Sequence, residues 1–179
     1  MIHIHIDYPE PIRTFWIFFI KPFWWFWIII LIPIVIPIAE SYISKWLNKR
    51  WLKKHKRLIE WKTMNHKKFE IIVAIIFESL GYKTKVVGGS GDEGIDVIAY
   101  KDGKRFFIQC KRKDQVSPRE IREFAGAIRD LNKEKGEKGF FVTTGEFTEE
   151  GKSFAKNNPI EIDLINGFGL ERLAKEIEK

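Results

Sequence analysis

The chain has 179 residues, enough for one domain of ordinary size with an appendage. Its single cysteine, Cys110, excludes an internal disulfide and is typical of a reducing compartment. The formal net charge of +7 suggests a nucleic-acid partner, but residues 1–68 carry +8 and residues 69–179 carry −1. A globally basic C-terminal domain is therefore excluded. Attraction to DNA has to come from local patches or from the basic segment upstream.

Residues 1–14 predict a short N-terminal tail, in which Ile alternates with His and Asp before two prolines break the pattern. His3 and His5 could ligate a metal from one face of a strand, but no further ligand lies nearby in the sequence. A polar tail without a metal is the better interpretation.

The stretch of residues 15–39 predicts a transmembrane helix. From Pro22 to Ala39 it carries no charge and is dominated by Phe, Trp and Ile, and its length is near the lower end of the roughly 17–25 residues that cross a bilayer. Its tryptophans resemble an interfacial aromatic belt, and Lys21 could reach the headgroups. A buried soluble helix is disfavoured because the stretch is apolar on all sides. A cleaved signal peptide is disfavoured because a basic leading region is missing.

Residues 40–65 predict a basic juxtamembrane helix. An excess of Lys and Arg beside a membrane helix is typical of the cytoplasmic side. We therefore expect a single-pass protein of the cell membrane whose C-terminal domain is cytoplasmic. Ile43, Leu47, Trp51 and Leu58 fall near one helical face, which predicts an amphipathic stalk on anionic lipid. A DNA-gripping arm is the alternative, and the two roles can coexist.

Residues 66–179 predict a globular domain. Apolar residues recur at helical spacing from Phe69, and Gly81 is a natural helix stop. Ser117-Pro118-Arg119-Glu120 predicts a helix start with a capping box. The strands expected are Tyr82–Val87, Ile95–Lys101, Lys104–Lys111, Lys138–Thr144 and Ile160–Leu164, and the later helices reach Leu131, span Thr148–Asn157 and span Gly169–Glu178. This order predicts an α/β fold with helices on both faces of the sheet.

Two neighbouring strands of this domain carry candidate chemistry. Asp102-Gly103 between them predicts a type I′ hairpin, because both residues tolerate a positive φ. Side chains alternate along a strand, so Gln109 and Lys111 share one face, while Asp96 lies on the partner strand. The hairpin thus brings a carboxylate, an amide and an ammonium to one edge of the sheet. Such a set can bind a divalent metal and position a water for attack on a phosphodiester.

The spacing Asp96-x(12)-Gln109-x-Lys111 resembles the PD-(D/E)xK nuclease superfamily. The lead-in Gly91-Asp92-Glu93-Gly94-Ile95-Asp96, and a glutamine where most members have an acid, resemble its Mrr-type restriction endonuclease branch. The resemblance runs from about Phe69 to the C-terminus and does not cover the first third of the chain. It implies a restriction-endonuclease-like core with a mixed sheet, and hydrolysis of DNA that depends on Mg²⁺ or Mn²⁺.

The resemblance also implies roles for individual residues. Asp96 is expected to be the primary metal ligand, with the amide oxygen of Gln109 and the backbone carbonyl of Cys110 as further ligands. Lys111 is expected to polarise the attacking water or to stabilise the negative charge that develops on the phosphate. The neutral Gln109 predicts a weaker metal site than a carboxylate would give.

Two acidic residues, Glu70 and Asp92, each have two interpretations of equal weight. Glu70 matches an acidic position in the family's first helix and could hold the metal through water, or it is a solvated glutamate in a favourable first turn. Asp92 matches the first Asp of the family's Gly-Asp-x-Gly-x-Asp run, or it only shapes the turn. Arg112 and Lys113 are expected to contact DNA phosphates.

We therefore expect a membrane-anchored, Mg²⁺-dependent DNA endonuclease of the Mrr restriction type. One alternative is a structure-selective nuclease, such as a junction resolvase on the same core. Another is a catalytically inactive module that binds nucleic acid or a partner protein at the membrane. Cutting both strands would need a homodimer or two monomers, and the sequence does not assign a sequence or methylation specificity.

Overall fold

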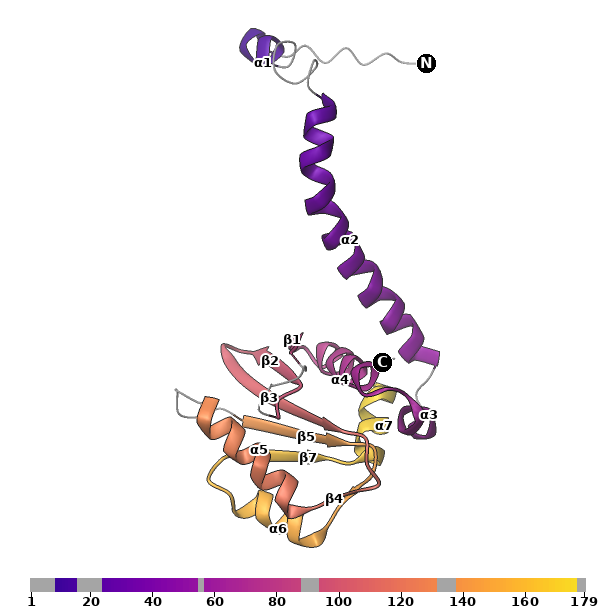
Figure 1. Ribbon diagram of the computed structural model, residues 1–179, viewed down its shortest axis with the longest axis vertical. Coiled ribbons are helices and arrows are strands. Elements are labelled where there is room, and N and C mark those ends of the chain that lie inside the picture. The colour runs from indigo at the N-terminus through magenta and orange to yellow at the C-terminus, as the bar shows by residue number, and fades with distance from the viewer. Residues whose placement is uncertain (1–8, 16–23, 55–56, 88–93, 132–137, 177–179) are drawn as a thin grey trace. The chain divides into compact units, whose positions relative to one another are not determined.

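A computed structural model of the chain describes residues 9–15, 24–54, 57–87, 94–131 and 138–176 (Figure 1). These residues form two compact units, with the boundary after Trp46. Residues 1–8 of the predicted tail, with His3 and His5, and residues 88–93, with Asp92, lie outside the described residues.

The first unit contains α1, Glu10–Phe15, and most of α2, Trp24–Lys54. The Ile, Leu and Val side chains of α2 from Ile28 to Ile38 are all exposed. Among the described residues, one segment, Ile28–Leu52, is long and apolar enough to cross a membrane, and its apolar part is not buried by protein. Length and composition alone also fit a signal sequence near the N-terminus.

The structure differs from the two helices expected between residues 15 and 65. α2 continues without a break to Lys54, because no glycine or proline interrupts it after Pro37. The short α3, Leu58–Thr63, follows. Some apolar side chains of the predicted lipid-facing stalk belong instead to the protein core, where Leu52 and Trp61 are buried and Trp51 and Leu58 pack against them.

The second unit is built on a mixed sheet of five strands in the order β1-β2-β3-β5-β7 (Figure 1). The strands are β1 Lys83–Val86, β2 Val97–Lys101, β3 Lys104–Lys111, β5 Lys138–Thr143 and β7 Ile162–Ile165. β1, β2 and β3 pair antiparallel, whereas β3, β5 and β7 pair parallel. β3 therefore pairs antiparallel with β2 and parallel with β5.

Helices cover both faces of this sheet. α4, His66–Ser79, and α7, Gly167–Glu176, pack on one face, and α5, Pro118–Leu131, and α6, Glu149–Asn157, pack on the other. The predicted α/β class, with a mixed sheet flanked by helices, is confirmed. A second sheet pairs β4, Gln115–Val116, with β6, Glu146–Phe147. It was not predicted, because two residues show no periodicity.

Local signals in the sequence place the ends of several elements. The type I′ turn is confirmed by positive φ values of 52° at Asp102 and 74° at Gly103. The capping box of α5 is confirmed, because Glu120 accepts hydrogen bonds from the backbone N–H and the hydroxyl of Ser117. Partial burial would raise the pKa of Glu120, but these bonds and the Lys113 ammonium lower it overall.

Candidate active site

Asp96 lies one residue before β2 and is tied to β3 by backbone and side chain. Its N–H donates to the Ile108 carbonyl at 2.9 Å, which extends the hairpin pairing by one residue. Its Oδ2 accepts hydrogen bonds from Gln109 Nε2 at 2.9 Å and from the Cys110 N–H at 2.6 Å. The structure thus brings together three of the residues that the sequence singled out. It also fixes the Asp96 carboxylate at the end of the hairpin away from its turn.

Gln109 is only 6% exposed, and its amide is held in one orientation. Because Nε2 donates to Asp96, Oε1 is the amide atom available for another ligand. Gly94 lies against this oxygen: a Cβ added to Gly94 would come within 3.0 Å of Oε1. The φ of Gly94 is +84°, a conformation that residues with a side chain adopt only with strain. Glycine at position 94 therefore makes room for the Gln109 oxygen.

Cys110 contributes its backbone to the site, while its side chain packs in the core. Within a strand, the N–H and the C=O of one residue point to the same side. The Cys110 N–H donates to Asp96, so the Cys110 carbonyl is directed to that side too. Burial raises the pKa of the Cys110 thiol well above its usual value, and the negative charges of Asp96 and Glu70 add to the effect. Glu70, on α4, is therefore within electrostatic range of the hairpin.

Lys111 is the last residue of β3 and is half-buried. It pairs in register with Thr143 of β5, and its carbonyl accepts a hydrogen bond from the Thr144 N–H at 3.2 Å. Strand alternation places its side chain on the same face as that of Gln109. The backbone of Lys111 is thus held by β5.

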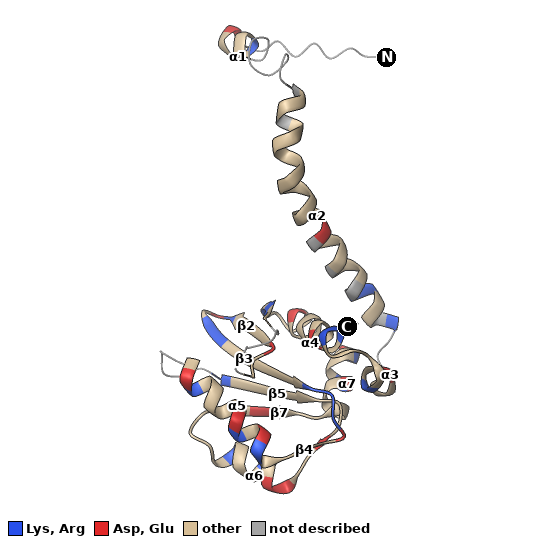
Figure 2. Ribbon diagram, viewed as in Figure 1, with Lys and Arg blue, Asp and Glu red and all other residues tan. Residues whose placement is uncertain are grey.

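A run of cations follows at the end of β3 (Figure 2). The two side chains expected to contact phosphates are both bonded within the protein. Arg112 donates from Nη1 to the Lys62 carbonyl at 2.8 Å, and the Lys113 ammonium lies 3.1 Å from both carboxylate oxygens of Glu120. Asp92, the other candidate, is outside the described residues.

The atoms gathered here fit a hard divalent cation. Mg²⁺ prefers oxygen ligands, and the site offers the Asp96 carboxylate, the amide oxygen of Gln109 and the carbonyl of Cys110, while Glu70 is within electrostatic range of Cys110. No group of three His, Cys, Asp or Glu side chains that could hold a metal occurs among the residues that the structure describes. A metal at this site would accordingly need the amide and the backbone carbonyl as ligands.

One part of the site was missed in the sequence, the turn after β5. Thr143 Oγ1 donates to the Lys113 carbonyl and accepts from the Gly145 N–H, each at 3.2 Å. A Cβ on Gly145 would lie 2.1 Å from the Asp114 carbonyl oxygen and 2.2 Å from that of Lys113. This turn therefore supports the loop after Lys111. The signal in the sequence was Thr143-Thr144-Gly145 at the end of a buried strand.

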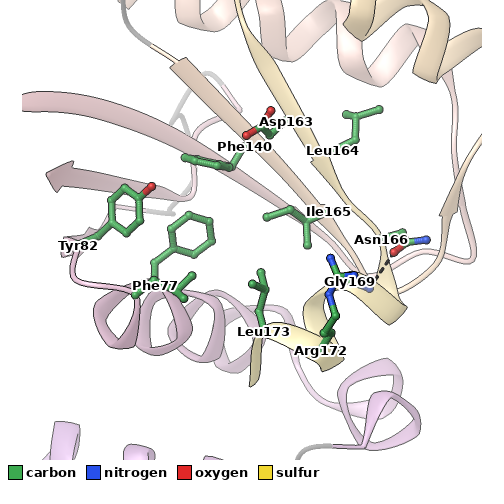
Figure 3. A pocket seen from close by; sticks show the side chains of 11 residues that line it. Phe77, Tyr82, Phe140, Asp163, Leu164, Ile165, Asn166, Gly169, Arg172 and Leu173 are labelled. Carbon is green, nitrogen blue, oxygen red and sulfur yellow. Dashed lines mark hydrogen bonds between the residues drawn. The ribbon is translucent and has the colours of Figure 1, made fainter. Parts of the chain in front are cut away.

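A cavity of about 430 Å³ lies away from these residues, beside β7, α4 and α7 (Figure 3). Its walls include Phe77, Phe140 and Leu173, and Asp163 and Arg172 supply charge. None of the residues predicted for the site lines it. The cavity is therefore distinct from the hairpin site.

Comparison with known proteins identifies relatives of the second unit. A family model, Mrr_cat, described as a restriction endonuclease, matches residues 61–174. The type IV methyl-directed restriction enzyme EcoKMrr of Escherichia coli (strain K12) is 33% identical over 120 residues, which cover 62% of this chain and 38% of that protein. This chain thus aligns with well under half of the length of that relative.

Two solved structures are also similar. The protein of unknown function AF1548 is 25% identical with a TM-score of 0.53, over 63% of this chain and 67% of its own. The MspJI restriction endonuclease, in complex with a 27-mer oligonucleotide, is 19% identical with a TM-score of 0.43, over 73% of this chain and 30% of its own. The family match spans the sheet, its flanking helices and the hairpin with Asp96, Gln109 and Lys111. The chain belongs to the restriction endonuclease family that the Mrr_cat model describes.

Proposed function

We propose that this protein is an endodeoxyribonuclease of the Mrr restriction type, which hydrolyses DNA phosphodiesters with Mg²⁺ or Mn²⁺. The observation that carries the proposal is the Asp96 carboxylate, bonded to the side chain of Gln109 and to the backbone of Cys110 beside Lys111. Family membership supports DNA cleavage as the reaction. The proposal does not include the methyl-directed action for which EcoKMrr is named, since this chain aligns with only 38% of that protein.

Each residue of the site has its own part in the reaction. Asp96, the Gln109 amide oxygen and the Cys110 carbonyl would hold the divalent cation, and Glu70 would contribute through water. The bound cation would supply an activated water and neutralise charge on the scissile phosphate. Lys111 shares a strand face with Gln109, and from there its ammonium would stabilise the negative charge that develops on the phosphate oxygens.

Lys113 is the best candidate among the described residues at the end of β3 for contacting a DNA phosphate. Its side chain is 53% exposed, and its pairing with Glu120 is a partly exposed ion pair. Such pairs contribute roughly 0–1 kcal/mol, so a phosphate can replace the carboxylate at little cost. Asp92 would add a further carboxylate, as the family's motif implies.

We further propose that α2 anchors the enzyme in the cell membrane as a single span. The exposed apolar side chains from Ile28 to Ile38 support a lipid environment. Lys and Arg in the last two turns of α2 favour a cytoplasmic position for the nuclease unit. A homodimer would supply the second site that a double-strand cut needs.

A second candidate function is binding of nucleic acid without cleavage. It is favoured by one observation, the neutral Gln109 at a position where a carboxylate would strengthen metal binding. The two functions make opposite predictions about phosphodiester hydrolysis.

The test uses the full chain in detergent micelles, because Leu52 and Trp61 are part of the nuclease core and a fragment that starts at residue 66 would lack them. Supercoiled plasmid is incubated with Mg²⁺, with Mn²⁺ or with EDTA. We expect nicking that needs the cation and is lost in Asp96→Asn and Lys111→Ala. Asp130→Asn, a matched change of an exposed carboxylate on α5, should cut like the wild type. Binding of DNA without nicking under either cation would favour the second candidate.

A further inference from the structure

We propose that Arg112 is a positioning residue, which ties the loop after β3 to α3, and that it does not contact DNA phosphate. The proposal rests on the proposed nuclease function. It gives α3, the six-residue helix that precedes α4, a role in positioning Lys111.

The guanidinium of Arg112 is already committed to the protein. Nη1 donates to the Lys62 carbonyl at the C-terminal end of α3 at 2.8 Å. Nε is buried, and no described atom accepts a hydrogen bond from it. Arg recognises phosphate best through two parallel N–H donors. With Nε covered, the Nε–Nη2 edge of Arg112 cannot present such a fork to a phosphate, and the remaining Nη1–Nη2 edge is already bonded to α3 through Nη1.

A second hydrogen bond joins α3 and the loop after β3, and here α3 supplies the donor. Lys62 reaches from α3 to the loop, where its ammonium donates to Asp114 Oδ1 at 2.8 Å. This bond and the Lys62 charge lower the pKa of Asp114. Arg112 and Lys62 thus each donate to a group on the other segment, so the loop and α3 are fastened at two points.

α3 is itself a fixed support. Trp61 is fully buried in the core. On α7, a Cβ added to Gly167 would lie 2.8 Å from both methyl carbons of Leu58, so α3 packs closely against the start of α7. Because α3 is fixed by this packing, its hydrogen bonds can fix the position of the loop after β3.

The other side of the loop rests on the turn after β5. Gly145 lies against the carbonyls of Lys113 and Asp114, and the Glu146 N–H donates to the Asp114 carbonyl at 2.9 Å. The Gly167 N–H donates to the Gly145 carbonyl at 3.0 Å, which links this turn back to the segment that supports α3. The loop after β3 is thus connected to α3 on one side and to the turn after β5 on the other, and both of these contact the start of α7.

Lys111 is joined to this loop by one peptide bond. When the Arg112 tie is removed, we expect the end of β3 to loosen and the Lys111 ammonium to lose its fixed position. A misplacement of about 1 Å can lower a rate on the order of 100-fold. Because the phosphate contacts of other residues remain, DNA affinity should be unaffected.

The experiment measures two quantities on the full chain, kcat and KM for nicking and the salt dependence of DNA binding in Ca²⁺. For Arg112→Ala we expect kcat to fall about 10- to 100-fold with KM unchanged and with the same slope of log K against log [salt]. Arg112→Lys restores the charge but not the Nη1 donor that reaches the Lys62 carbonyl, so kcat should remain low. The matched control, Lys113→Ala, should reduce the slope by about 0.9, which is the contribution of one phosphate contact.

Asp114→Ala is a second test in case Arg112→Ala does not fold. It should fold, because the Asp114 carboxylate is 90% exposed. It should lower kcat less than Arg112→Ala does, because an exposed ion pair contributes little. A loss of about 0.9 in the salt slope for Arg112→Ala, rescue of kcat by Arg112→Lys, or a larger fall in kcat for Asp114→Ala than for Arg112→Ala would each overturn the inference. A wild type that binds DNA but never cuts would instead sink the proposed nuclease function, while the salt slope still tests whether Arg112 contacts phosphate.

Discussion

The substitution Gly94→Ala tests the geometry around Gln109 most directly. The φ of +84° costs an alanine about 1–2 kcal/mol relative to glycine. The new Cβ would also lie 3.0 Å from Gln109 Oε1, and Gln109 is bonded to Asp96, so the amide cannot move without loss of that bond. A net loss of about 1 kcal/mol for the hydrogen bond gives a total destabilisation of about 2–3 kcal/mol.

Gly103→Ala separates the cost of the positive φ from the cost of the contact with Gln109. Gly103 has a φ of +74°, close to that of Gly94, but a Cβ there would meet nothing within 4 Å. We expect Gly103→Ala to lose only the backbone contribution, about 1–2 kcal/mol, and to nick plasmid like the wild type. Gly94→Ala should lose more stability and most of its nicking activity, because the amide oxygen is displaced.

The assay is urea unfolding of the detergent-solubilised chain, followed by aromatic fluorescence, with nicking of supercoiled plasmid as the second readout. Equal m-values for the two variants would show that stability, and not the unfolded state, has changed. The reasoning is refuted when Gly94→Ala and Gly103→Ala lose the same stability and both retain wild-type nicking.

Three further predictions concern the loop after β3 and its neighbours. Gly145→Ala would place a Cβ within 2.2 Å of two carbonyl oxygens, so we expect a loss of more than about 3 kcal/mol in urea unfolding, and a loss under about 1 kcal/mol would contradict the close approach. The lowered pKa of Glu120 means that its ionised form stabilises the fold above the unfolded value near 4.5, and that this stabilisation is lost as the pH falls through the folded pKa. The stability difference between the wild type and Glu120→Gln should therefore shrink between about pH 6 and pH 3, and a constant difference would argue against it. Because Cys110 is buried and the pKa of its thiol is raised, Ellman's reagent at about pH 8 should label it only after urea is added, and rapid labelling of the native chain would contradict its burial.

The convergence of Asp96 and Gln109 could be predicted because it depends on local rules. The Asp102-Gly103 turn fixes the register of the hairpin, and strand alternation then decides which side chains share a face. The same local rules gave the capping box of α5. Each of these features joins residues that are close in the sequence or lie on one hairpin.

The Arg112–Lys62 contact could not be predicted in this way. It joins residues 50 positions apart, and the sequence shows Arg112 only as a member of a basic run. The charge of Arg112 suggested a phosphate contact. The burial of its Nε depends on tertiary packing, which leaves no local pattern in the sequence. The same reason explains Trp51 and Leu58, whose helical spacing suggested a lipid-facing stalk although they pack against the protein core.

The end of α2 has a consequence for how the nuclease unit could be released from the N-terminal part of the chain. α2 carries the exposed apolar stretch, yet near its end Leu52 is 1% exposed within the second unit. A protease that cuts between Leu52 and Trp61 would remove part of the hydrophobic interior and leave a damaged fragment. Scission before Trp51, inside the helix itself, would keep Trp51, Leu52 and Trp61 together with the nuclease core.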